Sequence, residues 1–350
     1  MLAIRDKFRI QIEVTNACDN ECTNCSRFTG HYRSTYFMKL EQVGKAIDSL
    51  LDFPGGIGIM GGEPLMHPEF SEICHLVRQK IPPERRHLHT SGYKWDIYSK
   101  LVRKTFGENV HFNNHSDMSQ KHHPMLISIS DVIDDKESIK RLVDNCWVNR
   151  KWCASINPKG SFFCEIAAAM DVLFEGPGGH PVTRGWWDKD PEAFQDQIDR
   201  YCYHCGACVP YFPVTLKERD VASVSNFLRL KEVGSPKLEK NGIRIHDEQL
   251  SQQQLEKFAL QWQPWNHLGL MAKDGEGKTE YDLYGKLYGY SLKFRRFLRS
   301  KSWTFERTER AINTWLWRLQ KVRKTEPEKL EVVTKQTNHE STAHYPITNE

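Results

Sequence analysis

The sequence lacks any apolar run long enough to cross a membrane. A transmembrane helix needs about 20 consecutive apolar residues, and no stretch of this chain approaches that length. The first residues, Met1 to Lys7, also lack the apolar core of a secretion signal. We therefore expect a cytoplasmic protein that has no membrane partner.

A strong net charge is also absent. The 49 basic and 45 acidic residues give a net charge of +4, which is too mild to indicate a partner by itself. With 39% hydrophobic and 27% charged residues, most of the 350-residue chain should be ordered. The length suits one large α/β domain with additions or two modest domains. We find no internal repeat.

Acidic residues are scarce between Lys293 and Lys324, where only Glu306 and Glu309 occur. The basic residues there are Lys293, Arg295, Arg296, Arg299, Lys301, Arg307, Arg310, Arg318, Lys321, Arg323 and Lys324, with Trp303, Trp315 and Trp317 among them. Cations with aromatic rings suit a phosphate backbone and stacked bases, which makes nucleic acid a candidate partner. The alternative is an amphipathic helix whose basic face lies in water. Its apolar face would consist of Ile312, Trp315, Leu316 and Leu319.

Cysteine, by contrast, is abundant, because the chain has ten. Eight of them lie in close groups, which are Cys18/Cys22/Cys25, Cys153/Cys164 and Cys202/Cys205/Cys208, while Cys74 and Cys146 stand apart. Clustered thiols in a reducing compartment usually bind metal rather than form disulfides. Cys74 falls within an apolar helical pattern and is most simply a buried small side chain.

Hydrophobic periodicity from residue 8 to about 142 alternates between strand and helix. The expected strands are 8–14, 57–60, 87–90, 110–113 and 126–129, and the expected helices are 38–51, 70–81 and 95–105. Such alternation predicts βα units around a parallel sheet. We therefore expect an α/β core over residues 1–145.

The pattern changes near Cys146. We expect a hairpin over 147–164 with its turn at Asn157–Gly160, and helices over 167–174, 191–201 and 248–262. These elements suggest a cysteine-rich domain over 146–220 and a helical basic region over 221–325. The tail from 326 to 350 is polar, lacks a periodic apolar face and is expected to be disordered.

The first cysteine group, Cys18-x3-Cys22-x2-Cys25, directly follows the first expected strand. Thiolates are soft ligands that suit iron–sulfur clusters. Three of them on a four-iron cube leave one iron open, and a small chelating molecule can occupy it. A zinc knuckle is the alternative, although no second ligand pair follows in the next hundred residues.

A second motif, Gly61-Gly62-Glu63-Pro64, stands at the end of the second expected strand. Glycine lets backbone approach a ligand closely, and Glu63 can pair with an ammonium group. In this order and at these strand ends, the two motifs resemble the radical S-adenosylmethionine (SAM) superfamily. The resemblance implies a partial (β/α)6 TIM-like barrel, a [4Fe–4S] cluster on Cys18, Cys22 and Cys25, and SAM at Gly61, Gly62, Glu63 and Pro64.

One position departs from the family pattern. Members usually carry an aromatic residue beside the adenine just before the third cysteine, where this chain has Asn24. Phe28 or Tyr36 could take over that contact. Weaker candidates for ribose or carboxylate contacts stand at the next two strand ends, where capping a helix is an equally good explanation. They are Ser91, within Thr90-Ser91-Gly92, and Asn113, Asn114 or Ser116.

The later cysteines resemble the SPASM/twitch extension of this superfamily, which holds auxiliary iron–sulfur clusters. The resemblance implies one auxiliary cluster held by four of five thiols, with Cys146 as a sixth candidate. The five are Cys153, Cys164, Cys202, Cys205 and Cys208. The alternative is a structural zinc bound by the last three cysteines and a residue such as His204.

The resemblance also implies the chemistry. A donor such as flavodoxin or ferredoxin reduces the cluster, SAM is cleaved, and a 5′-deoxyadenosyl radical abstracts a substrate hydrogen. An auxiliary cluster nearby favours oxidation, a donor thiol such as Cys146 favours epimerisation, and group migration gives rearrangement. The enzyme would thus be an oxidoreductase or an isomerase.

Several substrates fit this chemistry. They are a small hydroxylated or amino-bearing molecule (sugar, amino acid or nucleoside), an amino acid or base carried on nucleic acid, and a ribosomal peptide. The peptide ranks lower, because peptide-modifying relatives usually begin with a winged-helix segment and here the first strand starts by residue 8. A non-catalytic iron–sulfur or zinc scaffold is the remaining alternative, and it would have no use for the Gly61–Pro64 motif.

Overall fold

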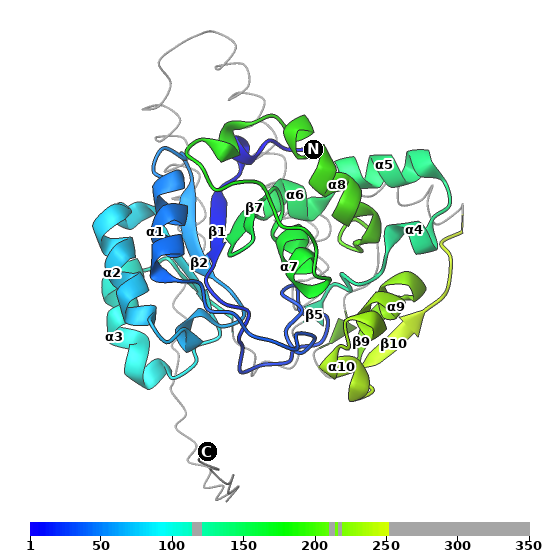
Figure 1. Ribbon diagram of the computed structural model, residues 1–350, viewed down its shortest axis with the longest axis horizontal. Coiled ribbons are helices and arrows are strands. Elements are labelled where there is room, and N and C mark those ends of the chain that lie inside the picture. Colours follow the sequence, from blue (N-terminus) through cyan, green and yellow to red (C-terminus); the bar gives the residue numbers. More distant parts are fainter. Residues whose placement is uncertain (114–120, 210–213, 216–218, 252–350) are drawn as a thin grey trace, which may run out of the picture.

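The computed structural model describes residues 1–113, 121–209, 214–215 and 219–251. Its centre is a six-stranded sheet in the order β4-β3-β2-β1-β6-β7 (Figure 1). The strands are β1 (Arg9–Glu13), β2 (Gly56–Met60), β3 (Arg86–Thr90), β4 (Val110–Phe112), β6 (Ala154–Asn157) and β7 (Gly160–Phe162). All neighbours are parallel except β6 and β7, which are antiparallel. The mixed α/β class with a mainly parallel sheet is therefore confirmed.

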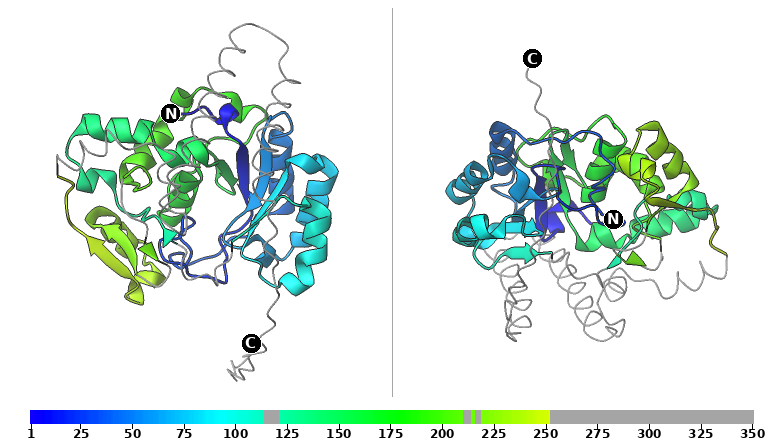
Figure 2. Two further views of the ribbon diagram at one scale, coloured as in Figure 1. Left: turned by 180° about the vertical axis from the view of Figure 1, so that it is seen from behind. Right: turned by 90° about the horizontal axis from the view of Figure 1, so that it is seen from below.

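Three amphipathic helices follow the first three strands and lie together beside the sheet (Figures 1 and 2). They are α1 (Leu40–Ser49), α2 (Phe70–Lys80) and α3 (Trp95–Phe106). Even-numbered residues of β1, such as Ile10 and Ile12, are fully buried in the apolar core. Cys74 of α2 is fully buried in the same core, as expected for a small apolar side chain.

The opposite face of the sheet is polar. Successive strand residues point to opposite sides, so Arg9, Gln11 and Glu13 share one side. Residues in register continue this side across the sheet, because Gln11 is level with Gly58 and Ser155, and Gly58 is level with His87. His89 is likewise level with His111. We call this surface the inner face, and its residues are Arg9, Gln11, Glu13, His87, His89, His111 and Ser155.

The predicted hairpin and its turn are confirmed for residues 154–162, which belong to the same sheet. The first part of the expected range is wrong, because Trp147–Lys151 forms the helix α6. β6 pairs with β1 on the side away from β2, and Gly160 begins β7 with a φ of +132°, which favours glycine. The spatial order of the strands in this sheet therefore differs from their order along the chain, since β1 lies between β2 and β6. A boundary at residue 146 separates segments of the chain but does not divide the sheet.

The expected strand over 126–129 is wrong. Only Leu126 forms an isolated bridge, to Ala222, and α4 (Ile129–Val132) starts three residues later. Residues 125–129 are buried throughout, and a short run that is apolar on all sides does not distinguish strand from helix.

Short helices and two small sheets complete the described residues. The remaining α-helices are α5 (Lys136–Asp144), α6 (Trp147–Lys151), α7 (Glu165–Leu173), α8 (Gln195–Tyr201), α9 (Val224–Glu232) and α10 (Pro236–Glu239). The 3-10 helices are η1 (Ile4–Asp6), η2 (Pro64–Met66), η3 (Pro83–Arg85), η4 (Trp186–Asp188), η5 (Pro191–Phe194) and η6 (Cys202–His204). β5 (Lys121–His122) pairs antiparallel with β8 (Val214–Thr215), and β9 (Asp220–Ser223) pairs parallel with β10 (Ile243–His246).

The segment after residue 220 is thus mixed rather than purely helical, as far as residue 251. The basic stretch 293–324, the tail 326–350 and most of the expected helix 248–262 lie outside the described residues. Among the helices that are described, none is long and apolar enough to cross a membrane.

Candidate functional site

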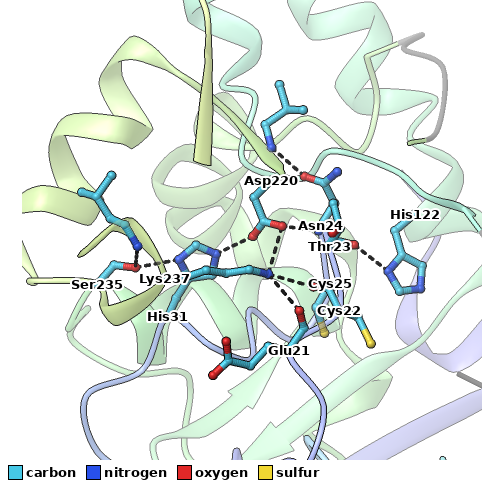
Figure 3. A network of polar contacts seen from close by, with 12 residues as sticks. Glu21, Cys22, Thr23, Asn24, Cys25, His31, His122, Asp220, Ser235 and Lys237 are labelled. Atoms are coloured by element: carbon cyan, nitrogen blue, oxygen red, sulfur yellow. Dashed lines mark hydrogen bonds and ion pairs between the residues drawn. The ribbon is translucent and has the colours of Figure 1, made fainter. Parts of the chain in front are cut away.

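The first cysteine group forms a loop at the carboxyl end of β1, which we call the cluster loop (residues 18–25). All three cysteines are half-buried and none forms a disulfide among the described residues, and the sulfur atoms of Cys22 and Cys25 point to the same side (Figure 3). Backbone N–H groups of Asn20 and Arg27 donate to the sulfurs of Cys18 and Cys25, each at 3.4 Å. Such contacts stabilise ligand thiolates.

Burial dominates the acid–base behaviour of two of these thiols. It raises the pKa of Cys22 to about 12 and the pKa of Cys18 further. A thiol of this kind becomes a thiolate only when a cation compensates its charge. Two such thiols, with the third cysteine of the same loop, fit a metal–sulfur group.

The glycine motif holds the backbone before the cluster loop. The N–H of Gly62 donates to the Thr15 carbonyl at 2.8 Å, and the N–H of Glu63 donates to the Ala17 carbonyl at 2.7 Å. A Cβ on Gly61 would stand 2.2 Å from the Thr15 oxygen. The glycines therefore allow two backbone segments to touch, and this contact brings the two sequence motifs to one place.

Glu63 is fully buried, and its carboxylate ties the end of β2 to the end of β3. It accepts hydrogen bonds from the Leu65 N–H, the Thr90 hydroxyl, and the N–H and hydroxyl of Ser91, at 2.6 to 3.0 Å. The structure thus brings together Glu63 and Ser91, two of the residues predicted to contact SAM. Four bonds nearly saturate a carboxylate, so an incoming ammonium would replace one donor, most simply the rotatable Ser91 hydroxyl.

The candidates for the adenine contact and for the ribose or carboxylate contacts lie in different environments. Phe28 is 2% exposed and belongs to the apolar core, so its ring offers no free face. Tyr36 is half-buried and donates weakly to the Glu13 carbonyl at 3.4 Å. Asn113 is exposed at the end of β4, where its N–H donates to the Thr90 carbonyl. Asn114 and Ser116 lie outside the described residues.

Asn24, the departure from the family pattern, has a structural role. It adopts a φ of +49°, which Asn tolerates well. Its N–H donates to Asp220 at 2.6 Å, and its side-chain oxygen accepts from the Val221 N–H at 2.9 Å. Asn24 therefore joins the cluster loop to β9, far along the chain (Figure 3).

A buried ion pair stands on the inner face next to the cluster loop. Arg27 Nη1 donates to Glu13 Oε1 at 2.6 Å, and the Ser155 hydroxyl donates to the same oxygen at 2.5 Å. Burial opposes the charge of Arg27, but the Glu13 carboxylate outweighs it and raises the Arg27 pKa. The Nε and Nη2 atoms of Arg27 are buried and have no hydrogen-bond partner among the described residues.

Histidines extend the inner face over β3 and β4. Arg9 contacts the His89 ring, and the His89 and His111 rings stack with centroids 4.4 Å apart. Burial and the Arg9 charge lower the pKa of His87 to about 2 and that of His89 well below its ordinary value. The His87 and His89 rings are therefore neutral near pH 7.

Cys153 also lies on the inner face. Gln11 Nε2 donates to its sulfur at 3.5 Å, while the Gln11 side-chain oxygen is buried without a partner among the described residues. Close by, Lys7 is buried and donates to the Phe163 carbonyl at 2.9 Å. Burial raises the pKa of Glu165, at the start of α7, to about 6.

The other late cysteines gather around one narrow cavity, which we call the thiol cavity. Its cysteines are Cys146, Cys164, Cys202, Cys205 and Cys208. Neither Cys153 nor His204 lines it. The sequence placed Cys153 in this group and Cys146 at its margin, but α6 turns the chain between them so that Cys153 reaches the start of β6. Burial raises the pKa of the cavity thiols.

Neither cysteine group surrounds a single point. Within the described part of the chain, no three Cys, His, Asp or Glu side chains converge closely enough to hold one metal ion.

Comparison with family models finds a match in the amino-terminal part of the chain. Residues 12–145 match the family model described as the Radical SAM superfamily. The family implies an enzyme with a [4Fe–4S] cluster, SAM, a reductant and a substrate. No curated protein matches the sequence.

Two solved structures are similar to this chain. A crystal structure of BtrN in an open conformation is 17% identical to this chain, with a TM-score of 0.36. The match covers 59% of this chain and 92% of the BtrN chain. A crystal structure of BtrN with AdoMet and 2-DOIA is 16% identical, with a TM-score of 0.35, and covers 57% of this chain and 88% of its own.

Proposed function

We propose that this chain is a radical SAM enzyme that removes a hydrogen atom from a small hydroxylated or amino-bearing substrate on the inner face and thereby oxidises it. The observation that carries the proposal is the junction of the two motifs. The Gly62–Thr15 and Glu63–Ala17 backbone bonds place a three-thiol loop beside a buried carboxylate with two hydroxyl partners. A scaffold protein would have no use for this arrangement.

Each end of the site has its own residues. Cys18, Cys22 and Cys25 would hold the cluster, and the backbone and carboxylate of the Gly61–Pro64 motif, with Ser91, would orient the methionyl part of SAM. When bound, the cluster and SAM supply a 5′-deoxyadenosyl radical. The protein then has to hold a substrate carbon close to that radical and exclude water.

The inner face supports a polar substrate. Among the described residues, the Nε and Nη2 donor atoms of Arg27 and the side-chain oxygen of Gln11 have no hydrogen-bond partner. Buried polar atoms without partners are costly, so these atoms favour a ligand that satisfies them. A sugar, amino acid or nucleoside has hydroxyl, amino or carboxylate groups for that role, whereas an apolar substrate would leave the atoms unpaired.

The thiol cavity supports oxidation. Four of Cys146, Cys164, Cys202, Cys205 and Cys208 would hold an auxiliary iron–sulfur cluster near the start of β1. Such a group can take the second electron from a substrate that has already lost a hydrogen atom.

A second outcome rests on Cys153. This thiol faces the substrate side and contacts Gln11, so it is better placed than Cys146 to return a hydrogen atom. That role would make the enzyme an epimerase, within the isomerase class.

Labelled substrates distinguish these outcomes. Reconstituted, anaerobically reduced protein is incubated with SAM and deuterated sugars, amino acids or nucleosides. Oxidation predicts deuterium in 5′-deoxyadenosine and a product two mass units lighter than the unlabelled substrate. Epimerisation predicts a product of unchanged carbon skeleton that gains one solvent hydrogen. If no polar substrate transfers deuterium, the substrate class is wrong.

The other partners remain predictions. Flavodoxin or ferredoxin would supply the electron. Nucleic acid would bind through the basic residues between 293 and 324, which lie outside the described residues. The ribosomal peptide ranks below both small molecules and nucleic acid.

A further inference from the structure

A segment near the end of the described chain forms hydrogen bonds with the cluster loop. Lys237, at the start of α10, donates from its ammonium group to the Cys22 carbonyl at 3.0 Å and to the Glu21 carbonyl at 3.3 Å (Figure 3). The same nitrogen lies 3.0 Å from Asp220 Oδ1. Lysine has three N–H donors, so these three contacts use all of them.

Asp220 contacts both Lys237 and the cluster loop. It accepts the Asn24 N–H at 2.6 Å and faces His31 Nε2 at 2.7 Å. The other nitrogen of His31 lies 2.8 Å from the Ser235 hydroxyl. Burial would raise the pKa of Asp220, but His31 and Lys237 outweigh it, so that the pKa is lowered and the carboxylate stays charged.

The side chains of Asp220, His31 and Lys237 in this network are buried. Asp220 is 1% exposed, His31 is 2% exposed and Lys237 is 7% exposed. Its charges are therefore poorly screened by solvent. The positive end of the Lys237–Asp220 pair points at the backbone carbonyl of Cys22.

We propose that Lys237, held by Asp220, is a positioning residue for the cluster: it fixes the cluster loop in its ligand-ready shape and makes the cluster easier to reduce. The inference rests on the proposed function, because it assumes a cluster on Cys18, Cys22 and Cys25. Reduction adds one negative charge to the cluster, and a nearby buried cation stabilises that charge. Net charge and hydrogen bonding near a cluster are known to set its potential.

Lys240, which contacts the same loop, provides a matched control. Lys240 pairs with Glu21 Oε1 at 3.0 Å, but its side chain is 62% exposed. An exposed pair is screened and contributes little. Lys240→Met therefore removes an exposed cation that contacts the same loop and leaves the buried one in place.

The experiment compares full-length, reconstituted wild type, Lys237→Met, Lys237→Gln and Lys240→Met. Redox titration follows the electron paramagnetic resonance signal that changes when SAM is added. We expect Lys237→Met to reduce the equilibrium constant for cluster reduction about tenfold, which is about 59 mV for one electron. Lys237→Gln keeps two donors but loses the charge, so it should shift in the same direction. Lys240→Met should stay within about twofold of wild type.

A second measurement tests positioning without iron. In apo protein, amide hydrogen exchange of residues 18–25 should become faster in Lys237→Met than in Lys240→Met. Unchanged potentials in both Lys237 variants, with full iron and unchanged exchange, would overturn the inference and leave the proposed function intact. A wild type that binds no cluster at the loop would overturn both.

Discussion

Gly62 and Ala17 approach so closely that a Cβ atom on Gly62 would stand 2.3 Å from the Ala17 carbonyl oxygen. This contact joins the turn after β2 to the residue before Cys18. The geometry of the three thiols therefore depends on Gly62, which has no side chain and supplies no ligand to the cluster.

Replacing Gly62 with Ala should displace the cluster loop. The added methyl meets rigid backbone, and overpacking of this kind costs about 1–3 kcal/mol. We expect lower thermal stability together with lower iron occupancy of the first site. Gly44→Ala is the control, because a Cβ at Gly44 in α1 meets nothing within 4 Å and should be neutral or slightly stabilising. Normal iron content in Gly62→Ala would show that the loop does not need this contact.

Replacing Cys18, Cys22 and Cys25 together with Ala should abolish 5′-deoxyadenosine formation. Wild type should bind about four irons at this site, because three thiolates fit one cube. Chromatographic detection of 5′-deoxyadenosine measures the outcome. Cys74→Ala, which alters a thiol buried in α2, should still cleave SAM. Cleavage by the triple variant would refute the assignment of the cluster.

Glu63→Gln should weaken SAM binding by about 1.5–3 kcal/mol, the usual contribution of a charge-assisted hydrogen bond. The substitution also turns one carboxylate oxygen into a donor that faces the Thr90 or Ser91 donors, so some loss of stability should accompany it. Calorimetric titration with SAM gives the affinity, and a thermal melt gives the stability. Glu41→Gln, on the exposed side of α1, should change neither. Unchanged SAM affinity in Glu63→Gln would mean that the carboxylate only joins two strands.

Cys146→Ser and Cys153→Ser should behave differently. Cys146 lines the thiol cavity and Cys153 does not, so Cys153→Ser should keep auxiliary iron and sulfide, whereas Cys146→Ser should lose them if Cys146 is one of the four ligands. Both variants are best made in the triple Ala background, where any remaining cluster absorption belongs to the second site. Zinc without sulfide in that background would establish a zinc site instead. Loss of the cluster in Cys153→Ser alone would restore the ligand set suggested by the sequence.

Local patterns in the sequence were sufficient for much of the fold. The alternation of Ile10 and Ile12 with polar residues marks β1, and the helical spacing of Val43 and Ile47 marks α1. The two motifs could be recognised because each is contiguous and stands at a strand end. The run at 126–129 was misassigned because it is buried on every side, which removes the periodicity that separates strand from helix.

Distant contacts had no such signal. Asn24 is bonded to Asp220, 196 residues away, and only the unusual residue type before Cys25 hinted at a different role. The choice between Cys146 and Cys153 depends on how α6 turns the chain, which spacing does not reveal. Lys237 stands in an ordinary short helix, so its contact with the cluster loop follows only from the tertiary structure.

The contact between Asn24 and Asp220 also bears on how the protein is made. A ribosome releases the cluster loop long before β9 and α10 exist, so the nascent loop has neither Asp220 nor Lys237 to shape it. β1 likewise lacks its β6 neighbour until residues around 154–157 have emerged. Cluster insertion should therefore follow completion of the segment that ends near Lys237. Stalled nascent chains ending before residue 220 should take up no iron at the loop, whereas chains with residue 246 clear of the exit tunnel should.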